Sequence, residues 1–149
     1  MISVAIVDDH PVTREGVRRL LEEAGEFFVT WEASDGREAL KRLEQSSPKV
    51  LIVDISMPGL SGLEVVRQVA KTSTFTKVLV VSMSDSEVHV FEALRSGADG
   101  YVLKTSGGEE ILDAVKAVAE GGHVLSSPFD DRLYERYVEG MRGSKVDPF

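Results

Sequence analysis

Short apolar runs alternate with stretches of helical periodicity along most of the chain. Continuous or nearly continuous apolar runs occupy residues 4–7, 27–33, 50–54, 77–82 and 100–104. Between and after them, apolar side chains recur three and four positions apart over residues 12–24, 36–44, 63–70, 88–94 and 111–119. Short apolar runs indicate buried strands, and the wider spacing indicates helices with one buried face. The pattern therefore predicts strands and helices in strict alternation.

Strict alternation favours one fold class. Parallel strands need a crossover connection, which is usually a helix, so we expect an α/β fold with a five-stranded parallel sheet. The helices should cover both faces of this doubly wound sheet. In open sheets of this kind, ligands bind beyond the carboxyl ends of the strands.

Polar side chains stand at the carboxyl ends of four predicted strands. Asp8 and Asp9 follow the first strand, Asp54 ends the third, Ser82 ends the fourth and Lys104 ends the fifth. Each alone has an ordinary explanation, such as a turn residue or a solvated lysine, and one aspartate of the pair is expected to cap the following helix. Together, at one rim of a single sheet, they predict a shared site.

Three carboxylates at one rim repel each other unless a positive charge lies among them. An oxygen-only ligand set with no histidine or cysteine selects a hard cation, so we expect Mg2+ held by Asp8 and Asp9. Beside that ion, Asp54 can act as a nucleophile toward a phosphoryl group and form an aspartyl phosphate. Lys104 and the metal would neutralise the transferring group, and Ser82 would donate a hydrogen bond to it. His10 is interpreted as shaping the rim rather than as a base.

Composition narrows the setting. The chain has 149 residues, 42% of them hydrophobic and 28% charged, which is typical of a globular domain with its own core. It shows no signal peptide and no apolar run near the ~20 residues of a membrane span, so we expect no membrane association. The absence of cysteine fits a cytoplasmic location. The net charge of −8 argues against direct nucleic-acid binding, which needs a basic surface.

Four segments carry a resemblance to a known family: VDDHP (residues 7–11), VDISMPGLSG (53–62), VVSMS (80–84) and GYVLK (100–104). Together they resemble the receiver domain of bacterial two-component response regulators over residues 2–121, and look most like the NarL/FixJ (LuxR-type) subfamily. The resemblance implies a flavodoxin-like fold with strand order 2-1-3-4-5. It also implies a phosphorylation switch, rather than a conventional enzyme, that a sensor histidine kinase sets.

The resemblance assigns a role to each residue of the predicted site. Asp54 matches the phosphoacceptor. Asp8 and Asp9 match the Mg2+ ligands, and Asp54 together with the backbone carbonyl of Ser56 completes the metal site. Lys104 matches the lysine that pairs with the phosphoryl oxygens.

The switch residues follow from the same resemblance. Ser82 matches the hydroxyl that turns toward the phosphoryl group, and Tyr101 matches the aromatic side chain that rotates afterwards. The output surface implied is the fourth helix, fifth strand and fifth helix, with these apolar candidates: Val88, Phe91, Leu94, Val115 and Val118. Homodimerisation on phosphorylation is expected through this face or through the first and fifth helices. Arg14 and Glu15 are equally consistent with kinase contact and with a solvated helix face.

Two positions depart from the family pattern. Met83 stands where a small residue is usual, and it could narrow the approach to Asp54. Thr105 stands where many receivers have a proline after the lysine, so this loop could take another shape.

We expect residues 1–122 to form the receiver domain and residues 123–149 to form a linker or an extra C-terminal helix near residues 130–141. A DNA-binding output domain, the usual partner module for transcription regulation, is absent from this chain. A stand-alone signalling regulator is the alternative.

Two other functions are compatible with parts of the pattern. A Mg2+-dependent phosphohydrolase of the haloacid-dehalogenase type also uses an Asp nucleophile, but usually carries Asp-x-Asp-x-Thr after its first strand, where this chain has DDHPV (residues 8–12). A flavodoxin-like binding module would need exposed aromatics or a Ser/Thr-rich loop at the strand ends, and none is visible.

Overall fold

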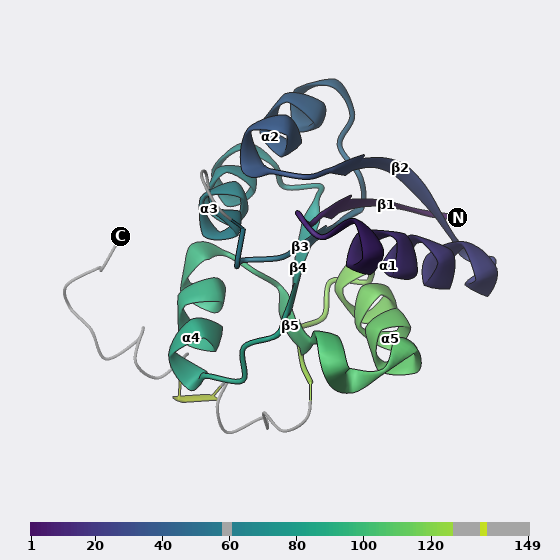
Figure 1. Cartoon of the computed structure of the whole chain (residues 1–149). Helices are drawn as coiled ribbons and strands as arrows, with labels where there is room; N and C mark the ends of the chain where they lie inside the picture. The colour runs from purple at the N-terminus through teal and green to yellow at the C-terminus, as the bar shows by residue number, and fades with distance from the viewer. Residues whose placement is uncertain (58–60, 127–134, 137–149) are drawn as a thin grey trace.

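Strands and helices alternate along the chain as the pattern predicts. The computed structural model describes residues 1–57, 61–126 and 135–136 (Figure 1). Its strands are β1 (Ile2–Val7), β2 (Phe27–Ala33), β3 (Val50–Val53), β4 (Lys77–Ser82), β5 (Gly100–Leu103) and β6 (Val124–Leu125). Its helices are α1 (Pro11–Ala24), α2 (Gly36–Gln45), α3 (Gly62–Thr72), α4 (Glu87–Ser96) and α5 (Gly108–Ala119), with a 3-10 turn at Lys104–Ser106. The predicted α/β fold class is confirmed.

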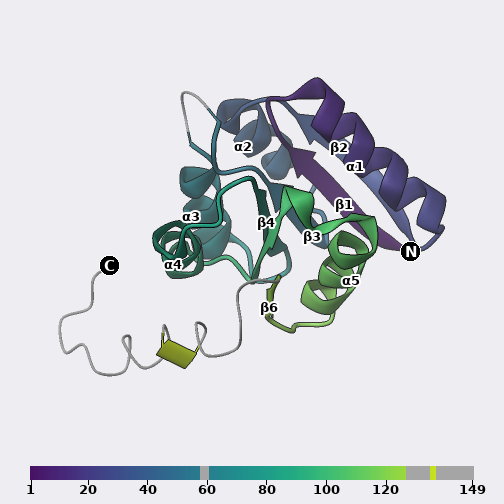
Figure 2. The same ribbon diagram turned by 60° about the horizontal axis from the view of Figure 1, so that its bottom comes forward.

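The sheet is parallel, with strand order β2-β1-β3-β4-β5-β6. The predicted order of the first five strands is confirmed. The sixth strand is a difference from the prediction, because two residues are too few to produce a readable apolar pattern. It extends the sheet beyond residue 122 and lies along β5 (Figure 2).

Hydrogen bonds from Ser126 fasten this edge of the sheet. Its backbone N–H donates to the Tyr101 carbonyl over 3.0 Å. Its side-chain hydroxyl accepts from the Leu103 N–H, also over 3.0 Å, and Ser126 is buried. The chain that leaves α5 is therefore tied to the middle and the end of β5.

Helices cover both faces of the sheet and create two cores. Val4 and Ile6 point to the face covered by α1 and α5, whereas Ala5 and Val7 point to the face covered by α2, α3 and α4 (Figure 1). Successive residues of a strand point to opposite faces, so a strand covered on both sides needs a continuous apolar run. This is why the central strands read as uninterrupted apolar segments.

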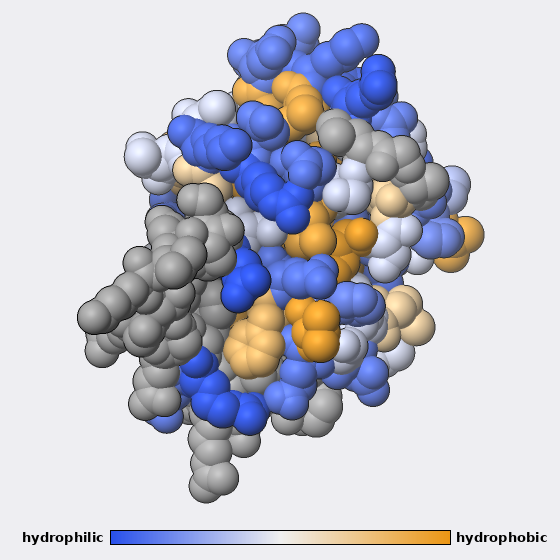
Figure 3. Space-filling view, turned by 90° about the vertical axis from the view of Figure 1, so that its left-hand side faces the viewer, coloured by the Kyte–Doolittle hydropathy of each residue, from blue (hydrophilic) through white to orange (hydrophobic). Residues whose placement is uncertain are grey.

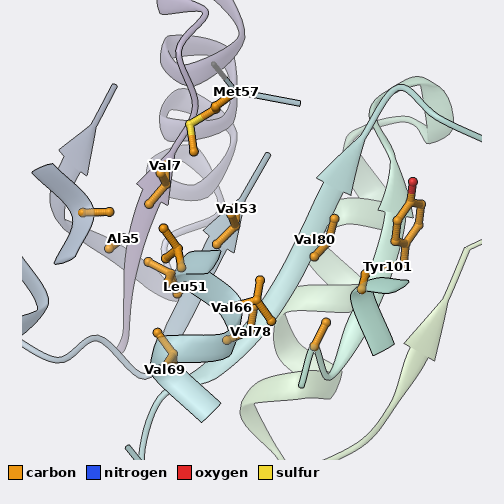
Figure 4. Close-up of a cluster of buried hydrophobic side chains, with 14 of the residues drawn as sticks. Ala5, Val7, Leu51, Val53, Met57, Val66, Val69, Val78, Val80 and Tyr101 are labelled. Atoms are coloured by element: carbon orange, nitrogen blue, oxygen red, sulfur yellow. The ribbon is translucent and has the colours of Figure 1, made fainter. Parts of the chain in front are cut away.

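Tyr101 lies in the core beneath α2, α3 and α4. It is completely buried and pairs with Val80 of the neighbouring strand. Figure 4 shows the Tyr101 ring beside Val80. The hydroxyl is at the outer end of the ring, away from the labelled aliphatic side chains. A polar atom is thus carried on a core side chain, which requires a hydrogen-bond partner.

Helix starts differ in how they are capped. Asp35 caps α2 and Ser61 caps α3, each accepting a hydrogen bond from a backbone N–H of the first turn. The N-cap of α1 is His10, which makes no side-chain cap. The expected capping role for one aspartate of the pair is therefore wrong. Asp8 accepts from the His10 N–H, outside the helix, because it stands two residues before the cap position.

The surface over α2, α3 and α4 is mainly hydrophilic, with separate hydrophobic patches (Figure 3). Most of the apolar candidates for an output surface lie in the core: Leu94, Val115 and Val118 are buried. Val88 is 61% exposed. Within the described residues, no helix has both the length and the apolar character that crossing a membrane requires.

Most of the helix predicted at residues 130–141 lies outside the described residues. Glu135 and Arg136 are described and helical. The Arg136 guanidinium lies 3.0 Å from the Glu87 carboxylate at the start of α4.

The close approach of α3 to the end of β3 generates a stability prediction. A Cβ on Gly62 would lie 2.3 Å from the Asp54 carbonyl oxygen and 2.7 Å from the Ile55 Cα, whereas a Cβ on Gly16 meets nothing within 4 Å. We expect Gly62→Ala to lower the free energy of unfolding by about 1–3 kcal/mol, because backbone must move. Gly16→Ala, the matched control on an exposed helix face, should raise it by up to ~1 kcal/mol.

Urea unfolding of both variants checks this. A Gly62→Ala variant as stable as the parent would contradict the close packing of α3 against the backbone of Asp54 and Ile55.

Candidate functional site

Polar side chains from three strands meet at the carboxyl edge of the sheet. Asp8 and Asp9 follow β1, Asp54 follows β3, and Lys104 follows β5. The Lys104 Nζ lies 3.0 Å from Asp8 Oδ2 and 3.1 Å from Asp54 Oδ2. Asp8 and Asp54 are buried, and Asp9 and Lys104 are partly buried. The structure thus brings together four of the predicted site residues.

Asp54 is held through both its backbone and its carboxylate. Its backbone N–H donates to the Val7 carbonyl over 2.9 Å, which continues the pairing of β3 with β1 past the strand end. Its Oδ1 accepts from the Ser56 N–H over 2.9 Å, while its Oδ2 faces Lys104. Ser56 therefore contacts Asp54 through its amide, and the predicted role of its carbonyl stays a prediction.

The position of Asp8 depends on a residue whose role the sequence does not reveal. The Arg14 guanidinium donates to the Asp8 carbonyl over 2.7 Å and to the Glu32 carboxylate over 3.2 Å. It therefore links α1, β2 and the loop after β1. Neither open interpretation of Arg14, kinase contact or solvated face, included this contact. No short-range pattern signals a contact six residues apart between a helix and a preceding loop.

Ser82 ends β4, the strand next to β3, and Tyr101 lies in β5; both contact the loop after β4. Ser82 is fully buried, and its hydroxyl accepts from the Ser84 N–H over 3.1 Å. The Tyr101 hydroxyl donates to the Ser84 carbonyl over 2.7 Å. In the part of the chain that the structure describes, no hydrogen bond joins Ser82 to the three carboxylates. The two predicted switch residues thus share one loop residue.

Burial and charge shift two pKa values here. Burial raises the pKa of Tyr101, and hydrogen bonds with Ser82 and Ser84 offset part of that effect. Burial alone would lower the pKa of Lys104, but its hydrogen bonds to Asp8 and Asp54 and their charges outweigh burial, so the net pKa lies above 10.5. Lys104 is therefore a stable ammonium ion at neutral pH, and Tyr101 a neutral phenol.

The cluster has the donor chemistry of a cation site. One ligand atom from each of Asp8, Asp9, His10 and Asp54 lies within 4.8 Å of the others. Asp9 Oδ1 is buried and has no hydrogen-bond partner among the described residues. A buried carboxylate oxygen without a donor is costly, and a bound cation would satisfy it. These residues therefore fit Mg2+.

Two further positions, Met83 and Thr105, are those that depart from the family pattern. Met83 is 64% exposed, and its effect on the approach to Asp54 stays a prediction. Thr105 lies in the 3-10 turn that follows β5. A groove of about 350 Å³ between α2 and α3 contains none of the predicted site residues.

Comparison with known proteins gives a consistent picture. Residues 4–116 match the family model described as the response regulator receiver domain. The nitrate/nitrite response regulator protein NarP of Escherichia coli is 38% identical over 98% of this chain and 66% of its own length. The transcriptional regulatory protein DegU of Brevibacillus brevis is 38% identical over 91% of this chain and 58% of its own length. The chain thus spans between about half and two thirds of these curated relatives.

Solved structures agree with the sequence matches. A LuxR-family two-component response regulator from Aurantimonas superimposes with a TM-score of 0.85 at 30% identity, covering 93% of this chain and 99% of that one. The signal receiver domain of the putative response regulator NarL from Mycobacterium tuberculosis gives a TM-score of 0.77 at 40% identity, covering 80% of this chain and 97% of that one.

The ion pairs of Lys104 generate a second stability prediction. We expect Lys104→Met to lower the free energy of unfolding of the metal-free protein by roughly 2 kcal/mol, below the ~3–5 kcal/mol of fully buried pairs, because the rim is partly open to solvent. Added Mg2+ should reduce this deficit, since the cation supplies the missing positive charge.

The pH dependence of this deficit has a defined sign. Folding raises the pKa of Lys104 above 10.5, so its contribution is complete below that pH and is lost as pH rises through the folded-state value. Urea unfolding of parent and variant should therefore show a constant difference from neutral pH to about pH 9, narrowing at higher pH. If the difference in the free energy of unfolding between parent and variant were smaller at neutral pH than at pH 9, the ion-pair assignment would be wrong.

Proposed function

The chain belongs to the response regulator receiver domain family, of the NarL and LuxR type, and from this premise we propose that it accepts a phosphoryl group on Asp54 from a sensor histidine kinase. One observation carries the assignment to Asp54. Its carboxylate is only 2% exposed, yet it lies at the sheet edge against an ammonium group and within a cluster of ligand atoms that could hold a cation. These surroundings suit a nucleophile that must accept a doubly charged group.

The transfer needs no redox partner and no base in the protein. An Asp54 oxygen forms a bond to phosphorus as the phosphorus–nitrogen bond of a kinase phosphohistidine breaks, and the imidazole leaves with the bonding electron pair. We assign Asp8, Asp9, Asp54 and the Ser56 carbonyl as the groups that hold Mg2+. When bound, this ion neutralises charge that develops on the phosphoryl oxygens. Lys104 already lies 3.1 Å from Asp54 and would pair with a phosphoryl oxygen.

The conformational response would start in the loop after β4. The hydroxyl of Ser82 accepts from the Ser84 N–H, and a rotation that aims its own O–H at a phosphoryl oxygen would change the geometry of this bond. Tyr101 is bonded to the carbonyl of the same Ser84. A change at Ser82 would therefore alter both bonds and the entry into α4, which is a two-state element biased by local charge.

The wider role is proposed on the same basis. Residues 1–122 form most of the receiver unit, with β6 added to its sheet, and the segment after it would lead to an output module. A DNA-binding module would regulate transcription, since this acidic chain does not suit nucleic acid itself. We expect homodimerisation on phosphorylation, and a cytoplasmic location shared with the kinase domain. A stand-alone regulator is the alternative arrangement.

Asp54 phosphorylation generates a direct test. Incubation with acetyl phosphate and Mg2+ should add the mass of one phosphoryl group, because this small donor also carries a phosphoryl group on a good leaving group: the bond from an Asp54 oxygen to phosphorus forms as the P–O bond to acetate breaks. Asp54→Asn should abolish the adduct, as should chelation of the metal. Asp113→Asn, which removes an exposed aspartate on α5, should leave it unchanged.

Intact-mass spectrometry is the measurement. An adduct that persists in Asp54→Asn, or no adduct in the parent protein with Mg2+ present, would sink the assignment.

The Tyr101 hydroxyl generates a test of the switch. Tyr101→Phe leaves the Ser84 carbonyl without its donor and should cost about 1 kcal/mol of stability. Phosphorylation on Asp54 should be retained in full, because the ring does not contact the reacting atoms. The change in hydrogen exchange of α4 amides on phosphorylation should be smaller than in the parent. An unchanged α4 response would remove Tyr101 from the switch.

A further inference from the structure

Hydrogen bonding does not account for how His10 sits in the acidic cluster. Its Nδ1 lies 3.0 Å from Asp9 Oδ1, 3.3 Å from Asp8 Oδ1 and 3.9 Å from Asp54 Oδ2. One ring N–H can donate to only one acceptor, and Nδ1 lies in hydrogen-bond range of Asp8 Oδ1. Asp9 Oδ1, the nearer atom, is buried and has no hydrogen-bond partner among the described residues, although the imidazole nitrogen lies 3.0 Å away.

The same distances fit ligands around a single metal ion. An octahedral ion with bonds of about 2.1 Å has neighbouring donors ~3.0 Å apart and opposite donors ~4.2 Å apart. The three separations of 3.0, 3.3 and 3.9 Å from the imidazole nitrogen fall in this range. One ligand atom of each carboxylate and the imidazole nitrogen lie within 4.8 Å of one another, so a cation that binds the nitrogen would lie among all three carboxylates, Asp9 Oδ1 included.

We propose that His10 is a nitrogen ligand of this site, and that it gives the chain a preference for transition-metal cations such as Co2+, Ni2+ or Zn2+ over Mg2+. The inference rests on the cation site of the proposed function and adds a fourth side chain to it. Imidazole suits these ions, whereas Mg2+ favours oxygen and water ligands. Mg2+ would use the carboxylates alone, and a transition-metal cation, Mn2+ included, would use the carboxylates and His10.

The local backbone holds His10 in place for this role. Its N–H donates to Asp8 Oδ1 over 2.9 Å, and its φ of −97° and ψ of 107° are extended, as expected before a proline. The backbone on both sides of the imidazole is therefore fixed by the strand end and by α1. The side chain itself is 62% exposed, so the ring can move aside without disturbing the core when a cation does not need it.

Calorimetric titration with Co2+ and with Mg2+ tests the proposal in the parent, His10→Ala and His10→Gln. We expect His10→Ala to weaken Co2+ binding by at least about tenfold and to change Mg2+ binding by less than about twofold. The matched control is His89→Ala, which removes an exposed histidine on α4 and should leave both affinities unchanged. Asp9→Asn should weaken the binding of both cations.

A spectroscopic readout separates ligation from a structural effect. Electron spin echo envelope modulation of bound Mn2+ should show a ¹⁴N coupling in the parent and in His89→Ala, and none in His10→Ala or His10→Gln. Absence of that coupling in the parent, or equal loss of Co2+ and Mg2+ affinity in both His10 variants, overturns the proposal. If Mg2+ still binds and Asp54 is still phosphorylated in that case, the proposed function stands without it. If the parent binds neither cation, both fail.

Discussion

The mutual repulsion of three carboxylates at one edge of the sheet is the constraint on which the rest of the site depends. Asp8 and Asp54 come from neighbouring strands, β1 and β3, and both contact the single ammonium group of Lys104 at about 3 Å. Without that charge the cluster would be self-repelling in a poorly solvated place. The negative charge is balanced in part by a fixed lysine, and the proposed cation would balance the rest; phosphorylation would change the balance between them.

The strand order explains why the residue at the end of β4 is small. Lys104 follows β5, and Asp54 follows β3. Because β4 lies between these two strands, the Lys104 side chain must reach across the carboxyl end of β4 to make its two ion pairs. Ser82 ends that strand, is fully buried and places only a hydroxyl there. A large side chain at this position would occupy the path of the lysine, so the lysine and the serine are linked by sterics as well as by chemistry.

The sequence predicts those parts of the structure that leave a local signal. Apolar runs locate β1 to β5, and the rule that parallel strands share a carboxyl edge places Asp8, Asp54 and Lys104 together from the sequence alone. The contacts of Arg14 leave no such signal, because they join groups that only the folded chain brings near. The sequence also does not predict β6. A strand of two residues is too short to leave an apolar pattern, and the hydrogen bonds of Ser126 fasten it to β5.

The pairing of β6 with β5 connects the site to the residues that follow α5. β5 carries Tyr101 in its middle and is followed directly by Lys104. Ser126 bonds to the Tyr101 carbonyl and to the Leu103 N–H, the residue before the lysine. A shift of β5 that follows the lysine or the tyrosine must therefore either carry β6 with it or break two hydrogen bonds, one of them to a buried hydroxyl. Since unmaking a buried hydrogen bond costs about 1–3 kcal/mol, moving the two strands together is the cheaper response. A movement at the acidic cluster would thus be passed along the sheet to β6 and Ser126, without passing through the helical surfaces.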